Sequence, residues 1–429
     1  MVWYPVTTVP VILGDGARLF DEIGEHKLKL SGAHFRMRLT VESPHGHAPS
    51  VALINGHTVP LTLVSAGSQD VAAVSTAGEG GSVLGFEAPS LFVAVRTARQ
   101  ATNTTLWVLP EDEAASLAWA TATATVTPFL QGWLGKQPRS QLTLLDLPDA
   151  EDTPFETGAL LATSIRPASP DQLNGILAHA LTHAWVQSPR AWLSEGVAHF
   201  MGTLWIEKQR GTEQALGSLE SNRAALSLAE PESPGQGVGQ PLADAISPVY
   251  YRTKATYALW MLRSVAGDGT LSAALRAYDP TVDQSNGSGK DTGSGTFEKL
   301  VEQAGSRRDL AWFFADWVDA DKGLPDLSIE NVFQAAEPSG SVLVSVTVNN
   351  VGYAAAEVPV TVRSAGATVT QRLLVPARGR GTQRILIQEK PVSVQVNDGT
   401  VPETQASVHI THLDPAAGSS SSQQIFRQK

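Results

Sequence analysis

The sequence predicts a multidomain α+β protein with β-rich ends and a mainly helical middle. Three observations lead to this prediction. The chain has 429 residues, which is enough for roughly two to four domains. Apolar and polar residues alternate near both ends, with the period of strands that bury one face. Between about residues 108 and 335 the apolar residues instead recur at helical spacing.

Residues 1–107 are expected to form a β-rich N-terminal domain. Residues 35–41 alternate between apolar and polar, and the apolar run 51–54 leads into Asn-Gly at 55–56. Asn-Gly between apolar runs is typical of a β-hairpin turn. Residues 79–82, Glu-Gly-Gly-Ser, predict a further turn.

Residues 108–335 are expected to form the mainly helical domain, with one short strand at 142–145. The predicted helices are 111–124, 170–187, 190–227, 249–278, 296–305 and 308–319. Two low-complexity polar stretches, 230–239 and 283–295, predict solvated loops.

Residues 336–413 return to a strand pattern. The predicted strands are 342–348, 358–362, 373–375, 385–387 and 392–394. Their spacing of roughly ten residues predicts an immunoglobulin-like β-sandwich. The Gly-, Ser- and Gln-rich residues 414–429 predict a disordered tail.

Composition narrows the function classes. The chain has no cysteine, so any metal must be held by His, Asp or Glu. A net charge of −11 argues against a nucleic-acid partner. No apolar run reaches the ~18 residues of a membrane span, and Met1–Pro5 does not begin a signal peptide. We expect a soluble monomer; the compartment stays open, with periplasm or secretion possible if the natural chain is longer.

A histidine pair is the most informative feature of the sequence. His179 and His183 are four residues apart in a helical pattern, so both imidazoles lie on one face and can chelate one ion. Pro189 ends this helix, and a second helix from about Ala191 brings Glu195 over the histidines. Two histidines and one glutamate leave the fourth zinc position open, as in a catalytic site. The sequence therefore predicts one zinc ion per chain.

The histidine pair alone would also fit two residues placed by chance on one helix face. The element Leu-Ser-Glu-Gly at 193–196 favours the metal-binding interpretation. His199 lies one turn after Glu195 and could be a ligand, but packing between helices is the favoured interpretation.

The stretch from His179 to Phe200 resembles the zinc helices of gluzincin peptidases, the group that contains aminopeptidase N. Their pattern is His-Glu-x-x-His, followed by a helix that carries Asn-Glu-Gly. Residues 250–255, Tyr-Tyr-Arg-Thr-Lys-Ala, resemble the family's Tyr-Glu-Lys-Gly helix start, and Glu156 stands where the family has its Gly-x-Met-Glu-Asn loop. The resemblance implies a thermolysin-like zinc peptidase domain at 108–335, and the terminal β-sandwich resembles the family's third domain.

The resemblance also implies residue roles. The two histidines and Glu195 bind zinc. Tyr251, with Tyr250 as the alternative, donates its hydroxyl to the oxyanion formed during peptide cleavage. Glu156 pairs with the α-ammonium of a peptide substrate, so the implied activity is that of an aminopeptidase. It also stays open that the tyrosines are core aromatics and that Glu156 is a surface carboxylate.

Four departures from the family pattern matter. Ala180 replaces the Glu of the first motif. The gap from His183 to Glu195 is short, which makes the chain similar to short-spaced relatives. The spacing from Tyr251 to Lys254 is one residue longer than in the family, and only the Glu of the Gly-x-Met-Glu-Asn loop is kept.

Ala180 bears directly on catalysis. In such sites the glutamate takes a proton from the zinc-bound water and delivers it to the leaving amine, a contribution of about 10²–10⁴-fold. Alanine has no group for this, so we expect a metallopeptidase that binds zinc and hydrolyses poorly or not at all. The other site residues are retained, which favours an engineered knockout. A natural pseudoenzyme that binds peptides and a zinc hydrolase with non-peptide substrates are the alternatives.

Overall fold

The computed structural model describes residues 33–66, 69–75, 82–83, 90–230, 239–280, 295–305 and 309–413, with Ile23, Glu25, His26 and Leu30. The turn expected at 79–82, the loops expected at 230–239 and 283–295 and the tail at 414–429 fall wholly or mostly outside these residues. Within them the protein is mixed α and β with several separate sheets, as predicted.

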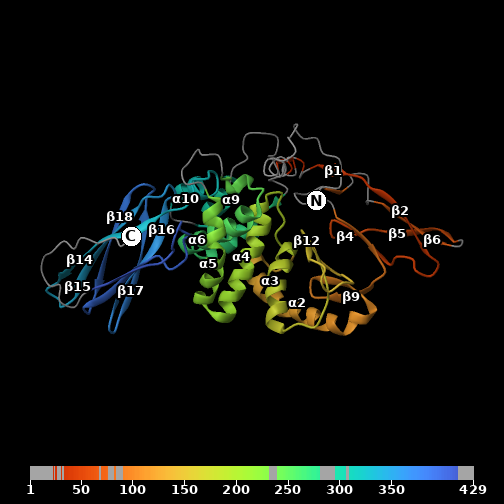
Figure 1. Cartoon of the computed structure of the whole chain (residues 1–429), viewed down its shortest axis with the longest axis horizontal. Helices are drawn as coiled ribbons and strands as arrows, with labels where there is room; N and C mark the ends of the chain where they lie inside the picture. The colour runs from red at the N-terminus through yellow and green to blue at the C-terminus, as the bar shows by residue number, and fades with distance from the viewer. Residues whose placement is uncertain are drawn as a thin grey trace. The chain divides into compact units, whose positions relative to one another are not determined.

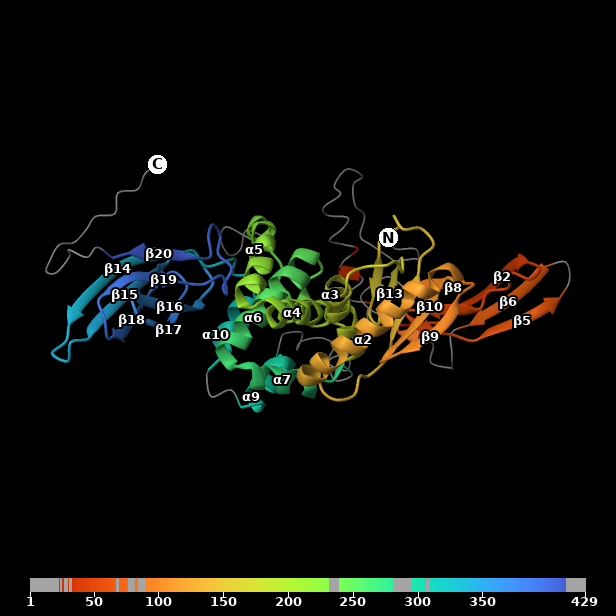
Figure 2. The same ribbon diagram turned by 90° about the horizontal axis from the view of Figure 1, so that it is seen from below.

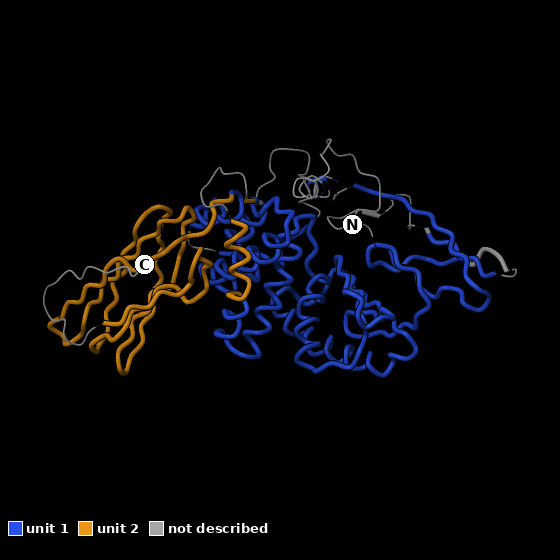
Figure 3. Tube along the Cα trace, viewed as in Figure 1, with its two compact units in different colours: residues 1–218, 240–320 blue, residues 219–239, 321–429 orange. Residues whose placement is uncertain are grey.

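The chain divides into two compact units (Figure 3). The first comprises residues 1–218 and 240–320, and the second comprises residues 219–239 and 321–429. The domain limits expected from the sequence stay predictions. Among the described residues, no helix combines the length and apolar character needed to cross a membrane.

The strands before residue 320 are β1 (His34–Phe35), β2 (Arg38–Pro44), β3 (Val51–Ile54), β4 (His57–Thr58), β5 (Leu61–Ala66), β6 (Gln69–Ser75), β7 (Ser82–Val83), β8 (Leu91–Ala94), β9 (Thr97–Ala101), β10 (Thr104–Val108), β11 (Leu142–Asp146), β12 (Phe155–Thr157) and β13 (Leu160–Thr163). The α-helices are α2 (Glu113–Leu134), α3 (Pro170–Ala180), α4 (Ala191–Arg210), α5 (Thr212–Ala229), α6 (Ala255–Ala266), α7 (Asp268–Ala277), α9 (Gly295–Gln303) and α10 (Ala311–Trp317). Short 3₁₀ segments are η1 (Pro110–Asp112), η2 (Leu181–Ala184) and η3 (Leu242–Asp244), and η4 (Val249–Lys254) is π-helical.

The hairpin predicted at Asn55-Gly56 is present. β3 pairs with β4 across it, and both turn residues have positive φ, 48° at Asn55 and 78° at Gly56. Asn and Gly tolerate this conformation, which a two-residue hairpin of this type requires. The two faces of β3 enter different cores: Val51 and Leu53 pack with residues of β11 and β13, while Ala52 and Ile54 pack towards β6.

A five-stranded sheet, ordered β12-β13-β11-β10-β9, forms the platform for the helices. Its central strand β11 pairs in parallel with β10 and β13 and is buried at every residue. That is expected for a parallel strand covered on both faces. Helix α2 packs against β9 and β10 (Figure 1). Strand β12 is at one edge of this sheet and β9 at the other, so the residues of β12 lie at the rim.

The second unit holds β14 (Leu327–Ala336), β15 (Val342–Asn350), β16 (Ala356–Ser364), β17 (Thr368–Val375), β18 (Arg380–Ile387), β19 (Pro391–Val396) and β20 (His409–His412) (Figure 2). They form two antiparallel sheets, β14-β15-β18 and β17-β16-β19-β20, which contact each other. Alternate valines of β15 and β16 are buried between them, as period-2 patterning requires. All five strands predicted between 342 and 394 are present.

β14 corrects the sequence analysis, which expected no strand between 319 and 338. A register shift between Ile329 and Asn331 marks a β-bulge. The bulge adds one residue and reverses the inward and outward alternation part-way along the strand. Leu327 and Ile329 face inward before it and Val332 after it. The period-2 signal is therefore split into two pieces too short to recognise.

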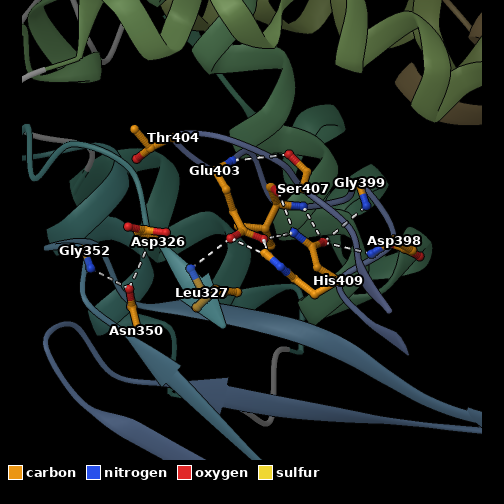
Figure 4. Close-up of polar contacts among 12 residues, drawn as sticks. Asp326, Leu327, Asn350, Gly352, Asp398, Gly399, Glu403, Thr404, Ser407 and His409 are labelled. Atoms are coloured by element: carbon orange, nitrogen blue, oxygen red, sulfur yellow. Dashed lines mark hydrogen bonds and ion pairs between the residues drawn. The ribbon is translucent and has the colours of Figure 1, made fainter. Parts of the chain in front are cut away.

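A buried polar network lies at the end of these sheets (Figure 4). Glu403 is 1% exposed and its carboxylate accepts hydrogen bonds from Leu327 N at 2.9 Å, from Asn397 Nδ2 at 2.8 Å and from His409 Nε2 at 2.9 Å. The backbone of Asn397 has φ 58°, and its Oδ1 accepts bonds from three following backbone amides. The network fixes the irregular segment 397–409 onto the first residue of β14.

Candidate metal centre

Five acidic and histidine side chains from four elements converge in the first unit. Edge strand β12 supplies Glu156, helix α3 supplies His179, and the 3₁₀ segment η2 supplies His183. Helix α4 supplies Glu195 and His199. The sequence analysis expected three of these residues to meet, and the structure also brings Glu156 and His199 to the same place.

Local sequence explains the bend between the two histidines. Helix α3 begins at a Ser169 cap, whose hydroxyl accepts a hydrogen bond from Gln172 N, followed by Pro170 at the first helical position. The helix then tightens into η2, where the Ala184 carbonyl accepts hydrogen bonds from two backbone amides at residues 139 and 140. The predicted helix 170–187 therefore ends early, and His183 lies on a 3₁₀ turn. The two imidazole centroids are 5.4 Å apart.

Close helix packing positions Glu195. The next residue, Gly196, lies so near α6 that a Cβ there would be 2.5 Å from the Ala255 Cβ. Any side chain at 196 would separate α4 from α6. The glycine thus lets α4 approach closely and directs Glu195 towards the histidines.

Distances among the side chains are those of a ligand cluster. Glu156 Oε2 is 3.1 Å from His179 Nε2, and Glu156 Oε1 is 3.9 Å from His183 Nε2. On the other side, Glu195 Oε1 is 3.6 Å from His183 Nε2. His183 therefore lies between the two carboxylates, and its side chain is fully buried.

Several of these atoms lack a hydrogen bond. Both ring nitrogens of His183, Glu156 Oε1 and Glu195 Oε2 are buried and make none. An unsatisfied buried polar atom costs about 1–3 kcal/mol, so a group of them in one place calls for an explanation such as a bound ion or water. Two overlapping groups could hold a metal ion: Glu156 with His179 and His183, and His179 with Glu195 and His199.

Ionisation favours metal binding by His183 and His199. Burial lowers the pKa of His183. Burial also lowers the pKa of His199 to about 3, helped by the nearby charges of His179 and Arg252. Both rings are therefore neutral near pH 7, the form in which imidazole binds a metal.

The Glu156 carboxylate and the His179 imidazole each shift the pKa of the other. Burial alone would raise the pKa of Glu156, but the His179 hydrogen bond and the neighbouring imidazoles outweigh it and lower that pKa to about 2. Burial likewise opposes the charged form of His179, but Glu156 and Glu195 raise its pKa. Glu156 is therefore an anion at neutral pH, as a metal ligand must be.

A cavity of about 350 Å³ adjoins the cluster. Its walls include Glu156, Tyr251 and Arg252, together with four apolar residues, Pro154, Phe155, Leu161 and Pro248. Tyr250 is not among its lining residues; Lys254 Nζ lies 5.5 Å from the centroid of the Tyr250 ring. The cavity is therefore lined by the tyrosine that the sequence analysis preferred.

The segment η4, which carries both tyrosines, is π-helical. Ala255 N donates to Tyr250 O, a bond that spans five residues and defines a π turn. A π turn holds one residue more than an α turn.

Two contributions were missed by sequence reasoning. Arg252 lines the cavity, and its Nε lies 3.4 Å from Glu195 Oε2; its place directly after Tyr251 was the available signal. The contact between Glu156 and both histidines had no signal, because β12 and α3 are brought together only by the fold. Ala180, the last residue of α3, is 1% exposed.

Comparison of the sequence with protein-family models gives no match, and comparison with curated proteins gives none either. Any functional assignment therefore depends on the residues of the site itself.

Proposed function

We propose that the chain binds one zinc ion in a gluzincin-type centre, takes peptides in the adjoining cavity, and hydrolyses them poorly or not at all. One observation carries the proposal: His183 lies beside His179 and 3.6 Å from Glu195, and this fully buried residue makes no hydrogen bond through either ring nitrogen. The donor set fits zinc, which favours imidazole nitrogen and carboxylate oxygen.

The family relationship is part of the same proposal. The order of the elements supports it: an edge strand with Glu156, a helix with the histidines, a return helix with Glu195, and a helix start with Tyr251. The finer fold descriptions, a thermolysin-like domain at 108–335 and an immunoglobulin-like sandwich at 336–413, belong here too. The two antiparallel sheets of the second unit are compatible with the latter.

Where a coordination position is free, a zinc ion in this centre would act as a Lewis acid that polarises a peptide carbonyl. The chain's own residues would do the rest. The Tyr251 hydroxyl would donate to the developing oxyanion from the cavity wall. Arg252 would hold Glu195 in place through its ion pair. At position 180 a methyl group stands where a base is needed, so proton transfer lacks its carboxylate.

The alternatives are a natural peptide-binding pseudoenzyme and a zinc hydrolase of other substrates. The first is favoured by a cavity that lies beside the centre although no carboxylate is available at position 180. The amine-anchoring role of Glu156 and the aminopeptidase activity stay predictions. Restoring a glutamate at position 180 tests whether hydrolysis belongs to this scaffold.

Elemental analysis of the full chain after dialysis tests the zinc proposal. We expect about one zinc per chain. His183→Ala should bind none, because His183 is central to the cluster. His199→Ala is the matched control and should keep its zinc, since it leaves the two histidines and Glu195 intact. Retention of zinc by His183→Ala, or its loss from His199→Ala, would show that another residue set holds the ion.

A further inference from the structure

We infer that Glu156 is a fourth metal ligand, so that the centre is closed by the protein itself. This inference rests on the proposed zinc centre and deepens it. A centre with three protein ligands keeps one position open for chemistry, whereas four protein ligands make a structural site. Glu156 is the residue that decides between the two.

Glu156, His179 and His183 have ligand atoms within 4.8 Å of one another, and Glu195 adjoins this group through His183. Two ligand atoms about 2.0–2.1 Å from a tetrahedral zinc ion lie about 3.3 Å apart. Glu156 Oε2 is 3.1 Å from His179 Nε2, which is close to this value. Its other oxygen is 3.9 Å from His183 Nε2, slightly farther than Glu195 Oε1 at 3.6 Å. Glu156 thus lies against both histidines, and it approaches His183 almost as closely as Glu195 does.

The same distances argue against Glu156 as a general base. A base that acts on a water molecule must leave room for that water between itself and the ion. Its carboxylate would then stand one water farther from the imidazole nitrogens than 3.1 Å. Glu156 instead touches His179 directly.

An outer-shell role, in which Glu156 only orients His179, fits less well. An orienting carboxylate receives a hydrogen bond from one imidazole and faces away from the other ligands. Here one carboxylate faces two imidazoles, and its Oε1 is buried without a hydrogen bond. A shared ion would satisfy this oxygen and the two nitrogens at once.

The backbone holds Glu156 in this position. It lies in the middle of β12, paired with Leu161 of β13, so a sheet and not a free loop presents the carboxylate. Two carboxylates also offset the two positive charges of a zinc ion, which lowers the cost of burying it. A buried four-ligand centre is therefore consistent with both the fold and the charge.

Zinc affinity of the full chain, measured by competition with a chromophoric chelator, tests the inference. Loss of an outer-shell partner costs about 10–100-fold in metal affinity. Glu156→Ala should lower affinity by more than ~100-fold. Glu151→Ala, which removes an exposed carboxylate five residues earlier, is the matched control and should change nothing. Glu156→Gln guards against misfolding, since it keeps the shape, and it should also weaken binding.

A second readout asks whether the centre has an open position. In the cobalt(II)-substituted chain, azide should leave the visible absorption unchanged, because no position is free. In cobalt(II)-substituted Glu156→Ala, azide should shift the spectrum. The inference would be overturned if azide shifted the spectrum of the cobalt(II)-substituted chain that keeps Glu156. It would also be overturned if Glu156→Ala lowered zinc affinity by less than ~100-fold. If the chain binds neither zinc nor cobalt, the proposed function itself fails.

Discussion

Two groups of glutamate and histidine, one in each compact unit, differ in whether their polar atoms make hydrogen bonds. At Glu403, both carboxylate oxygens and His409 Nε2 take part in hydrogen bonds of 2.8–3.1 Å. At the cluster around His183, four polar atoms are buried without any. The two groups share residue types, so composition alone does not tell them apart.

The difference indicates what each group is for. A fully satisfied polar network holds a fold in one arrangement and needs nothing from outside. A cluster that leaves both nitrogens of a buried imidazole unsatisfied costs stability, and a bound ion is what would offset that cost. The network at Glu403 is therefore structural, and the cluster at His183 is the candidate for a ligand.

Glu403→Ala should produce the largest effect on stability. It removes the acceptor for Leu327 N, Asn397 Nδ2 and His409, and loss of one partner of a buried ion pair costs about 3–5 kcal/mol. Denaturant unfolding of the full chain measures this. Glu389→Ala, an exposed carboxylate of the same unit, should cost about 1 kcal/mol or less. Zinc content should be normal in both. Zinc loss from Glu403→Ala would remove the distinction between the two groups.

Restored catalysis is the next effect in size. Ala180→Glu alone should stay nearly inactive, because Glu156 still occupies the fourth position. Ala180→Glu combined with Glu156→Ala should raise hydrolysis by at least ~10², the lower end for a general base. N-acetylated peptides are the suitable substrates, since their cleavage needs no anchor for an α-ammonium. Full activity of the single variant would argue that Glu156 does not close the centre.

The variant with both Ala180→Glu and Glu156→Ala is also the background in which the roles of the two tyrosines can be tested. Adding Tyr251→Phe should lower kcat with little change in KM, because the hydroxyl acts mainly in the transition state. Tyr250→Phe is the matched control and should leave both constants unchanged, since Tyr250 is not among the cavity-lining residues. The opposite result would reverse the tyrosine assignment.

The smallest effect concerns pH and the Glu403 network. The hydrogen bond to Glu403 raises the pKa of His409, aided by the charges of Glu403 and Asp326 and opposed by burial. A raised folded pKa stabilises fully below the unfolded pKa of about 6.5, and this stabilisation is lost as pH rises through the folded value. The free energy of unfolding should therefore fall with rising pH more in the unsubstituted chain than in His409→Gln. Parallel curves would mean that His409 does not titrate as described.

Sequence patterns predicted the regular parts well. Strands β15 and β18 pair along their length without a register shift, and the turn at Asn55-Gly56 needs only its own two residues. Helix α2 was underestimated, because it continues past Ala124 to Leu134 through Pro128. Proline disfavours a helix interior, but burial of Val126 and Leu130 outweighs that preference. Tertiary packing of this kind is not visible in a local pattern.

The residues of the candidate site likewise divide into those that local sequence predicts and those that only the fold brings together. His179, His183 and Glu195 could be proposed from spacing, since the chain links them through one helical hairpin. Glu156 was proposed as a site residue, but its contact with the histidines depends on where β12 lies in the sheet. Arg252 was missed, because its ion pair with Glu195 joins residues 57 positions apart in sequence. Long-range pairs of this type need the fold.

Because of the π turn at η4, the number of residues in this segment determines how the chain before it is rotated about the helix axis. Each residue of an α-helix turns the chain by about 100°. Deleting Thr253 would return η4 to ordinary winding and rotate everything before it by about that angle relative to α6. The one extra residue of the π turn thus determines that the side chain of residue 251 faces the cavity. A deletion in η4 would move a different residue into that place, whereas a substitution at 251 would change only the side chain that stands there.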